Sequence, residues 1–249
     1  IIQYPSIDGE AHNYQEFVAK AHEKGALVTV VADLLSLAIL TPPGEWDADI
    51  VCGTTQRFGI PMGFGGPHAA YFATREAYKR SIPGRIIGLS QDADGKPALR
   101  MALQTREQHI KRDRATSNIC TAQVLLAVMA GMYAVYHGKD GIRNIAQVIH
   151  DYTAQLAASL STLGYKINNV NFFDTISVEV ENNGASELLA KAVVARINLR
   201  LISDSQIGIS LNETVESDDL NELIQLFASH ENKDFAPMQG VPSYHLVDE

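Results

Sequence analysis

A segment dense in glycine and proline, residues 53–68, constrains this chain more than any other feature. It follows a short apolar stretch, residues 48–52, that has the composition of a strand. Glycine has no Cβ, so such density within an ordered protein indicates backbone that lies close to a ligand or to another stretch of backbone. A binding site or a close packing contact is therefore expected here.

In the first half of the chain, short apolar segments typical of strands alternate with segments that have the apolar spacing of a helix. This alternation predicts an α/β doubly wound layer. Apolar residues at helical spacing predict a helix over 11–24, which Gly25 would end. The continuous apolar run 26–32 predicts a strand covered on both faces of a parallel sheet. Further strands are predicted over 50–52 and 69–73.

Residues 80–115 are mostly polar and carry little periodicity, so we expect a functional or interface-forming segment there. Its basic side chains would either face solvent or contact an anion or another subunit. They are Arg100, Arg106, Lys111, Arg112 and Arg114.

The second half predicts a different architecture. A long helix would begin at Ser117 or Asn118 and run to about His137, and residues 138–141 are the expected domain boundary. Beyond it we predict an α+β unit around an antiparallel sheet. Its elements are a helix over 142–163 closed by Gly164, strands over 165–169 and 175–181, a helix over 185–197, strands over 199–203 and 207–211, and a helix over 217–230. The domains expected are 1–137 and 138–232, followed by a linker or tail over 233–249.

Composition excludes several classes of function. The chain is 46% hydrophobic and 20% charged, as in ordinary globular proteins, and its formal charge of −9 argues against nucleic-acid binding. No run approaches the roughly 20 apolar residues of a membrane-spanning helix. Cys52 and Cys120 lie in apolar contexts and are expected to be buried thiols in a reducing compartment. No paired Cys/His spacing indicates a metal site.

Three motifs resemble one known family. They are residues 55–70 (TQRFGIPMGFGGPHAA), 102–110 (ALQTREQHI) and 115–123 (ATSNICTAQ). Together with residues 3–9 and 32–35, they resemble glycine dehydrogenase (decarboxylating), the P-protein of the glycine cleavage system, over at least residues 3–123. The resemblance implies an aminotransferase-like fold, the pyridoxal-phosphate (PLP)-dependent transferase fold type I. This chain would hold part of its large domain and an α+β small domain.

The resemblance also bears on the cofactor. P-proteins consist of two similar halves, and the C-terminal half carries the lysine that binds PLP as a Schiff base. The matching position here is Gln56, whose amide nitrogen is not a usable nucleophile. We therefore expect no catalytic residue in this chain, and PLP in the complete enzyme without a covalent bond to this chain. Asp33 matches the carboxylate that keeps the pyridine nitrogen protonated, or else it caps the next turn.

Other residues are expected at a shared interface. Thr116 and Ser117 would reach the phosphate of the partner's cofactor, or they would simply cap a helix. The loop 63–68 would cradle a phosphate or pack against a neighbouring chain. The resemblance implies an access channel between the halves, to which Arg106, His109 and Arg112 are assigned.

The implied function is PLP-dependent glycine decarboxylation, with transfer of the aminomethyl group to lipoylated H-protein. The implied partner is a lysine-bearing C-terminal half or subunit in a dimer, in the cytoplasm of a bacterium or the mitochondrial matrix of a eukaryote. Residues 1–5 read as a strand already under way, without an initiator methionine, so we expect a piece of a longer protein. Two alternatives stay open: an independent PLP enzyme that uses another lysine, and a purely structural interaction module.

Overall fold

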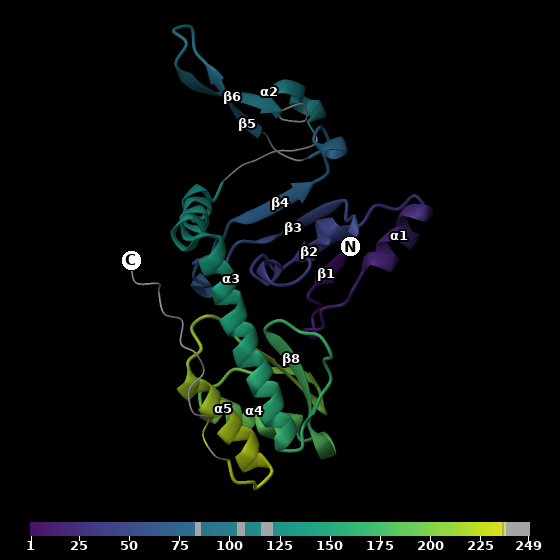
Figure 1. The fold of residues 1–249 in the computed structure, drawn as a ribbon, viewed down its shortest axis with the longest axis vertical. Helices are drawn as coiled ribbons and strands as arrows, with labels where there is room; N and C mark the ends of the chain where they lie inside the picture. The colour runs from purple at the N-terminus through teal and green to yellow at the C-terminus, as the bar shows by residue number, and fades with distance from the viewer. Residues whose placement is uncertain (83–85, 104–107, 116–121, 236, 238–249) are drawn as a thin grey trace.

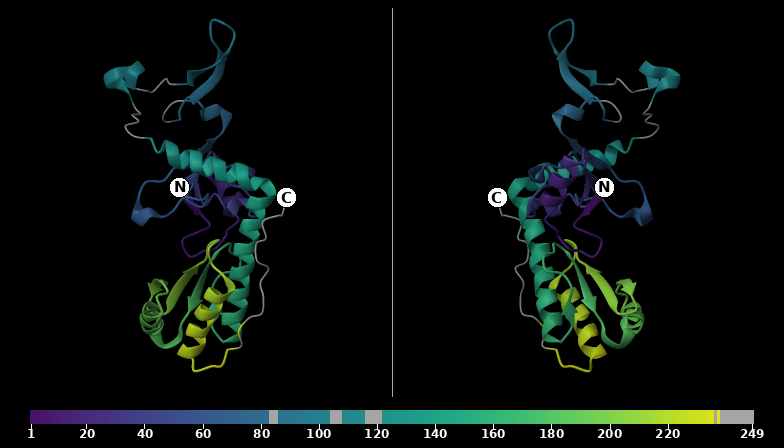
Figure 2. Two further views of the ribbon diagram at one scale, coloured as in Figure 1. Left: turned by 90° about the vertical axis from the view of Figure 1, so that its left-hand side faces the viewer. Right: turned by 90° about the vertical axis from the view of Figure 1, so that its right-hand side faces the viewer.

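The computed structural model describes residues 1–82, 86–103, 108–115, 122–235 and 237. The molecule is elongated, with one four-stranded sheet in the middle, a second at one end and a two-stranded hairpin at the other (Figures 1 and 2). The long helix α3, Val124–Thr162, connects the regions of the two larger sheets. The predicted α/β layer followed by an α+β unit is confirmed.

The first sheet has the strand order β1-β2-β3-β4, in which β1, β2 and β3 are parallel and β4 returns antiparallel. Its elements are β1 (Ile2–Tyr4), β2 (Thr29–Ala32), β3 (Ile50–Thr54), β4 (Ala70–Thr74) and the helix α1 (Gln15–Glu23). The predicted helix is confirmed, and it is followed by Gly25, whose φ is +73°. The predicted strands are confirmed as well, and the structure shows that the last of them runs antiparallel to its neighbour.

One face of this sheet is covered within the described residues, by a cluster that includes Val18 of α1 and Trp46. The opposite face carries a row of paired side chains from three strands, Val31, Cys52 and Phe72. Val31 is 40% exposed, Phe72 is 47% exposed, and Cys52 is only partly buried. The expectation that β2 is covered on both faces was therefore wrong for this part of the chain, as was the expectation that Cys52 is buried. Cys120 lies outside the described residues.

A hairpin of β5 (Ile86–Gln91) and β6 (Pro97–Leu103) occupies the segment in which the sequence showed little periodicity. Its turn is closed by Asp92, whose Oδ1 accepts the N–H groups of Asp94 and Lys96, and by Gly95 at φ +79°. The hairpin stands away from the rest of the molecule, and Leu89 and Leu99 are each 77% exposed (Figure 1). Neither face of these strands packs against a core in this structure. The sequence therefore lacks the alternation of apolar and polar residues that marks a half-buried strand.

Helix α3 has two arms that point in different directions, and the backbone changes course at Gly138, whose φ is +61° (Figure 2). The second arm reaches Thr162 and is followed by Gly164 at φ +94°, as predicted. The predicted start at Ser117 or Asn118 was wrong, because residues 122 and 123 are not helical and the helix begins at Val124. The predicted domain limits at 137/138 and 232/233 stay predictions, although the first falls at the bend.

The second sheet is antiparallel with the order β7-β8-β10-β9. Its elements are β7 (Lys166–Ile167), β8 (Thr175–Glu179), α4 (Ala185–Val194), β9 (Arg200–Ser203), β10 (Gln206–Ser210) and α5 (Ser217–His230). Its core joins the second arm of α3, the inner faces of β8 and β10, and both helices. A capping box between Glu216 and Asp219 begins α5 where the sequence predicted it.

Short helices complete the described structure. They are η1 (Ser36–Ala38), η2 (Pro43–Trp46), η3 (Gly63–Gly65), η4 (Glu76–Tyr78), α2 (Gln108–Lys111), η5 (Arg112–Arg114) and η6 (Glu181–Asn183). Among the described residues, no helix combines the length and the hydropathy that a membrane crossing requires.

Candidate functional site

Asp33 stands directly after β2, at the carboxyl end of the parallel strands. Its N–H donates to the carbonyl of Tyr4 at 3.0 Å, which fixes it beside β1. Its Oδ1 accepts the N–H of Leu35 at 3.1 Å, and the Ser36 hydroxyl donates to its carbonyl at 2.8 Å. One carboxylate oxygen therefore caps the following turn, and the other, Oδ2, is directed toward Arg57.

Gln56 follows β3 at the same edge of the sheet. Its N–H donates to the Thr54 hydroxyl at 3.2 Å, and that hydroxyl lies 3.3 Å from the Gln56 Oε1 atom. The side chain is thus engaged with its own loop. An amide in this setting offers neither a nucleophile nor a base to a bound molecule.

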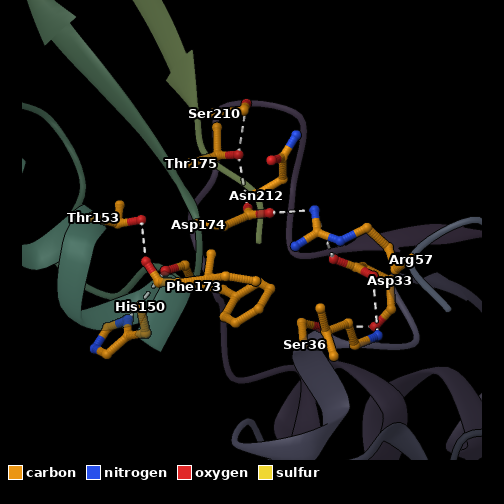
Figure 3. Close-up of polar contacts among 12 residues, drawn as sticks. Asp33, Ser36, Arg57, His150, Thr153, Phe173, Asp174, Thr175, Ser210 and Asn212 are labelled. Atoms are coloured by element: carbon orange, nitrogen blue, oxygen red, sulfur yellow. Dashed lines mark hydrogen bonds and ion pairs between the residues drawn. The ribbon is translucent and has the colours of Figure 1, made fainter. Parts of the chain in front are cut away.

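Arg57, the next residue, points into the space between the two large sheets (Figure 3). Its Nη1 atom donates to Asp174 Oδ2 at 2.6 Å and lies 3.8 Å from Asp33 Oδ2. The guanidinium carbon lies 5.7 Å from the centre of the Phe173 ring, within the range of a cation–π contact. Its Nε and Nη2 atoms are buried and have no hydrogen-bond partner among the described residues.

Asp174 is oriented by the second sheet, just ahead of β8. Its Oδ1 accepts the Thr175 hydroxyl at 2.9 Å, and that hydroxyl also contacts the Ser210 hydroxyl at 2.8 Å. Its carbonyl accepts the N–H of Leu211 at 2.9 Å. With backbone and one side-chain oxygen held in place, the remaining oxygen Oδ2 meets Arg57 (Figure 3).

The electrostatics of this group follow from burial and proximity. Burial raises the pKa of Asp33, and the positive charge of Arg57 opposes that rise. Burial acts to lower the pKa of Arg57, but the carboxylates of Asp33 and Asp174 outweigh it and raise the pKa. Arg57 therefore remains a cation, with a carboxylate of each sheet as its counter-ion.

These residues line a cleft of about 450 Å³. Both sheets contribute to its lining, which consists of residues 3–7, 9, 31–33, 53, 54, 57, 174, 175, 200 and 210, so Gln56 lies beside the cleft and not in its lining. Its floor is the carboxyl edge of the parallel strands, where open α/β sheets bind ligands. In the described part of the chain, no lysine is among the lining residues.

The described structure brings none of the other predicted site residues that it covers to this cleft. Thr116, Ser117 and Arg106 lie outside the described residues, and Arg112 is exposed in η5. In the loop 63–68, the N–H groups of Gly65 and Gly66 donate to Met62 and Gly63, so they are used within the loop itself. Their proposed roles at an interface stay predictions.

Sequence reasoning missed the Arg57–Asp174 pair. Arg57 was visible inside the longest motif, but nothing in its neighbourhood pointed to a carboxylate more than a hundred positions away. The available signal was a charged residue in a glycine-rich, otherwise apolar segment, because a charge that becomes buried needs a partner.

Comparison with solved structures establishes the fold of this chain as that of the PLP-dependent transferases of fold type I. One of them is a C-DES variant with glycine covalently linked to its PLP cofactor, at 16% identity and a TM-score of 0.59, where the match covers 91% of this chain and 59% of that one. A likeness at this identity establishes the fold alone.

The chain belongs to the glycine cleavage system P-protein family, whose model matches residues 1–227. It is 62% identical over 229 residues to glycine dehydrogenase (decarboxylating) of Nostoc punctiforme, a match that covers 92% of this chain and 23% of that protein. It resembles a crystal structure of glycine decarboxylase (P-protein) in inhibitor-bound form, at 33% identity and a TM-score of 0.81, covering 92% of this chain and 54% of that one. The chain thus spans about a quarter of the length of the curated relatives it matches.

The cleft of this chain does not fit PLP as a covalent cofactor. Gln56 occupies the position implied for the Schiff-base lysine, and no described lining residue supplies another amine. Asp33, the expected partner of the pyridine nitrogen, already faces the Arg57 guanidinium. Both positions expected to hold the cofactor, 33 and 56, are therefore occupied by side chains that already contact other residues of this chain.

Proposed function

We propose that this chain is the part of a glycine decarboxylase that lacks the Schiff-base lysine and supports the lysine-bearing part. The observation that carries the proposal is the amide of Gln56, which is engaged with its own loop beside a cleft that has no lysine among its described lining residues. Family membership supplies the reaction, because the relatives are named glycine dehydrogenase (decarboxylating).

In the complete enzyme, PLP on the lysine-bearing part would supply the electron sink for decarboxylation of glycine. The aminomethyl group would pass to lipoylated H-protein. This chain would shape and stabilise the partner in a dimer, and Thr116 or Ser117 would extend to the partner's site. The compartment proposed is the bacterial cytoplasm, or the mitochondrial matrix in a eukaryote.

Exposed apolar surface supports an obligate partner. The first arm of α3 carries a stripe of exposed apolar side chains, Val124, Leu125, Val128, Met132 and Val135. Phe64 in the glycine-rich loop is fully exposed, and Phe72 on the open sheet face is 47% exposed. Apolar surface of this extent marks a protein–protein interface more often than free surface.

Reconstitution tests this role. The lysine-bearing part is assayed for PLP- and H-protein-dependent release of carbon dioxide from glycine, with and without this chain. We expect turnover only when both are present, and borohydride reduction should place the cofactor on the other part alone. Full turnover without this chain would contradict the proposal, whereas assembly that changes without any change in turnover would favour a purely structural module.

A further inference from the structure

We propose that Arg57 is an internal counter-cation that positions the two large sheets relative to each other across this cleft. Its guanidinium lies between Asp33 at the end of β2 and Asp174 at the start of β8. The proposal rests on the proposed function in one respect, namely that the cleft corresponds to the cofactor site of the lysine-bearing part. The role of Arg57 between the two sheets is argued from the contacts within this chain alone.

The charges in the cleft require a cation at this point. Asp174 is 8% exposed, and the Asp33 side chain is 23% exposed, so neither carboxylate is fully solvated. Glu213 adds a third negative charge close enough to raise the pKa of both Asp33 and Arg57. Without Arg57, these carboxylates would repel one another across the cleft, and the sheets that carry them would separate.

A cation is not the simplest way to stabilise such a contact. Well-packed apolar side chains serve stability as well as a buried ion pair does, and often better. Moreover, the Nε and Nη2 donors of Arg57 are buried without an acceptor in the described structure, which costs stability. We therefore assign this charged pair a role in fixing how the two sheets are placed relative to each other. The directional hydrogen bond from Nη1 to Asp174 is suited to that role.

The rest of the connection between the sheets includes apolar packing, because the buried Leu35, two residues after Asp33, joins the core of the second sheet. Such packing is not directional, so it leaves the relative position of the sheets to other contacts. Helix α3 has non-helical backbone at Gly138, which makes that residue a weak point between its two arms. A further link lies at the surface, where the Glu10 carboxylate accepts the N–H groups of Val170 and Asn171 at 2.9 and 3.0 Å. Exposed contacts of this kind compete with water, whereas the Arg57 contact is largely shielded from it.

Hydrogen–deuterium exchange of the full 249-residue chain tests the proposal, with Arg57→Met as the main variant. We expect faster exchange at both ends of the contact, in residues 31–35 and 173–178, and around Gly138, together with an increased radius of gyration in solution scattering. Arg57→Lys should restore part of the protection, because it restores the charge. Glu10→Gln is the matched control at the exposed link and should leave the cleft segments unchanged.

A triple variant keeps the test decisive if Arg57→Met folds poorly. Arg57→Met/Asp33→Asn/Asp174→Asn removes the whole charged group, so it should recover most of the thermal stability lost by Arg57→Met. It should recover only part of the cleft protection, because the repulsion is gone but the directional contact is still missing. Unchanged exchange in Arg57→Met, or a triple variant no more stable than Arg57→Met, would overturn the proposal. Neither result depends on glycine decarboxylation, so failure of the positioning role and failure of the proposed function are distinguishable.

Discussion

The Nη1 atom of Arg57 lies 2.6 Å from Asp174 Oδ2, although the two residues are 117 positions apart and lie beside different sheets. Arg57 directly follows Gln56, the position that we propose corresponds to the Schiff-base lysine of the partner. Under this correspondence, an uncharged amide stands next to the cation that faces Asp33.

Restoring an amine alone should therefore not restore cofactor binding. We expect Gln56→Lys to form little borohydride-stable PLP adduct, because Arg57 still neutralises Asp33. The double variant Gln56→Lys/Arg57→Ala should form on the order of tenfold more adduct, a difference of about 1.4 kcal/mol. The amount of adduct is measured by intact mass and peptide mapping after reduction. Equal labelling at position 56 in both variants would show that Arg57 does not compete with the cofactor ring for Asp33.

Periodicity and glycine placement predicted most of the elements, because those signals act over a few residues. The helix α5 buries one face, and the strands β8 and β10 are buried on both faces over three consecutive residues each, so their sequence pattern reflects packing within this chain. The hairpin β5–β6 gave no such pattern because its apolar residues are exposed here. The pairing of Arg57 with Asp174 depends on how two sheets pack against each other, which no local pattern encodes.

The first glycine of the motif has a measurable role in packing. A Cβ at Gly53 would lie 2.3 Å from the carbonyl oxygen of Ala32 and 2.8 Å from a ring carbon of Tyr71, whose hydroxyl donates to that same carbonyl. Gly53→Ala should therefore lower the free energy of unfolding by about 1–3 kcal/mol, the usual cost of overpacking. Gly44→Ala is the control, since nothing lies within 4 Å of a Cβ there. Urea unfolding that gave the two variants the same stability would contradict the assigned contact.

The carboxylate of Asp49 predicts how stability depends on pH. Burial acts to raise the pKa of Asp49, but the N–H of Val28 and the ring of His22, each at 2.8 Å, outweigh it and hold the pKa below its usual value. The folded state therefore resists protonation more than the unfolded state does. The stability that Asp49 contributes is complete above its unfolded pKa of about 4 and is lost as the pH falls through the lower folded value.

Asp49→Asn should remove this dependence. Urea midpoints between pH 7 and pH 3 should show the variant less stable at neutral pH, and the difference from the parent should shrink as the pH falls below about 4. The exposed Asp140 provides a control for the chemical change itself, and Asp140→Asn should stay within about 0.5 kcal/mol of the parent at pH 7. A difference between Asp49→Asn and the parent that stayed constant across this range would contradict the pKa assignment.

The second arm of α3 should contribute more to stability than the first arm in this chain. Leu156 is fully buried in the cluster formed with the second sheet, whereas Leu125 on the first arm is 78% exposed. Leu156→Ala should lower the free energy of unfolding by about 2–5 kcal/mol, because it leaves a cavity that the surrounding core fills only in part. Leu125→Ala makes the same chemical change at an exposed site and should stay within about 0.5 kcal/mol of the parent. Equal losses in the two variants, measured by urea unfolding of the chain alone, would mean that the first arm is buried in solution, most simply by association of two copies through its apolar stripe.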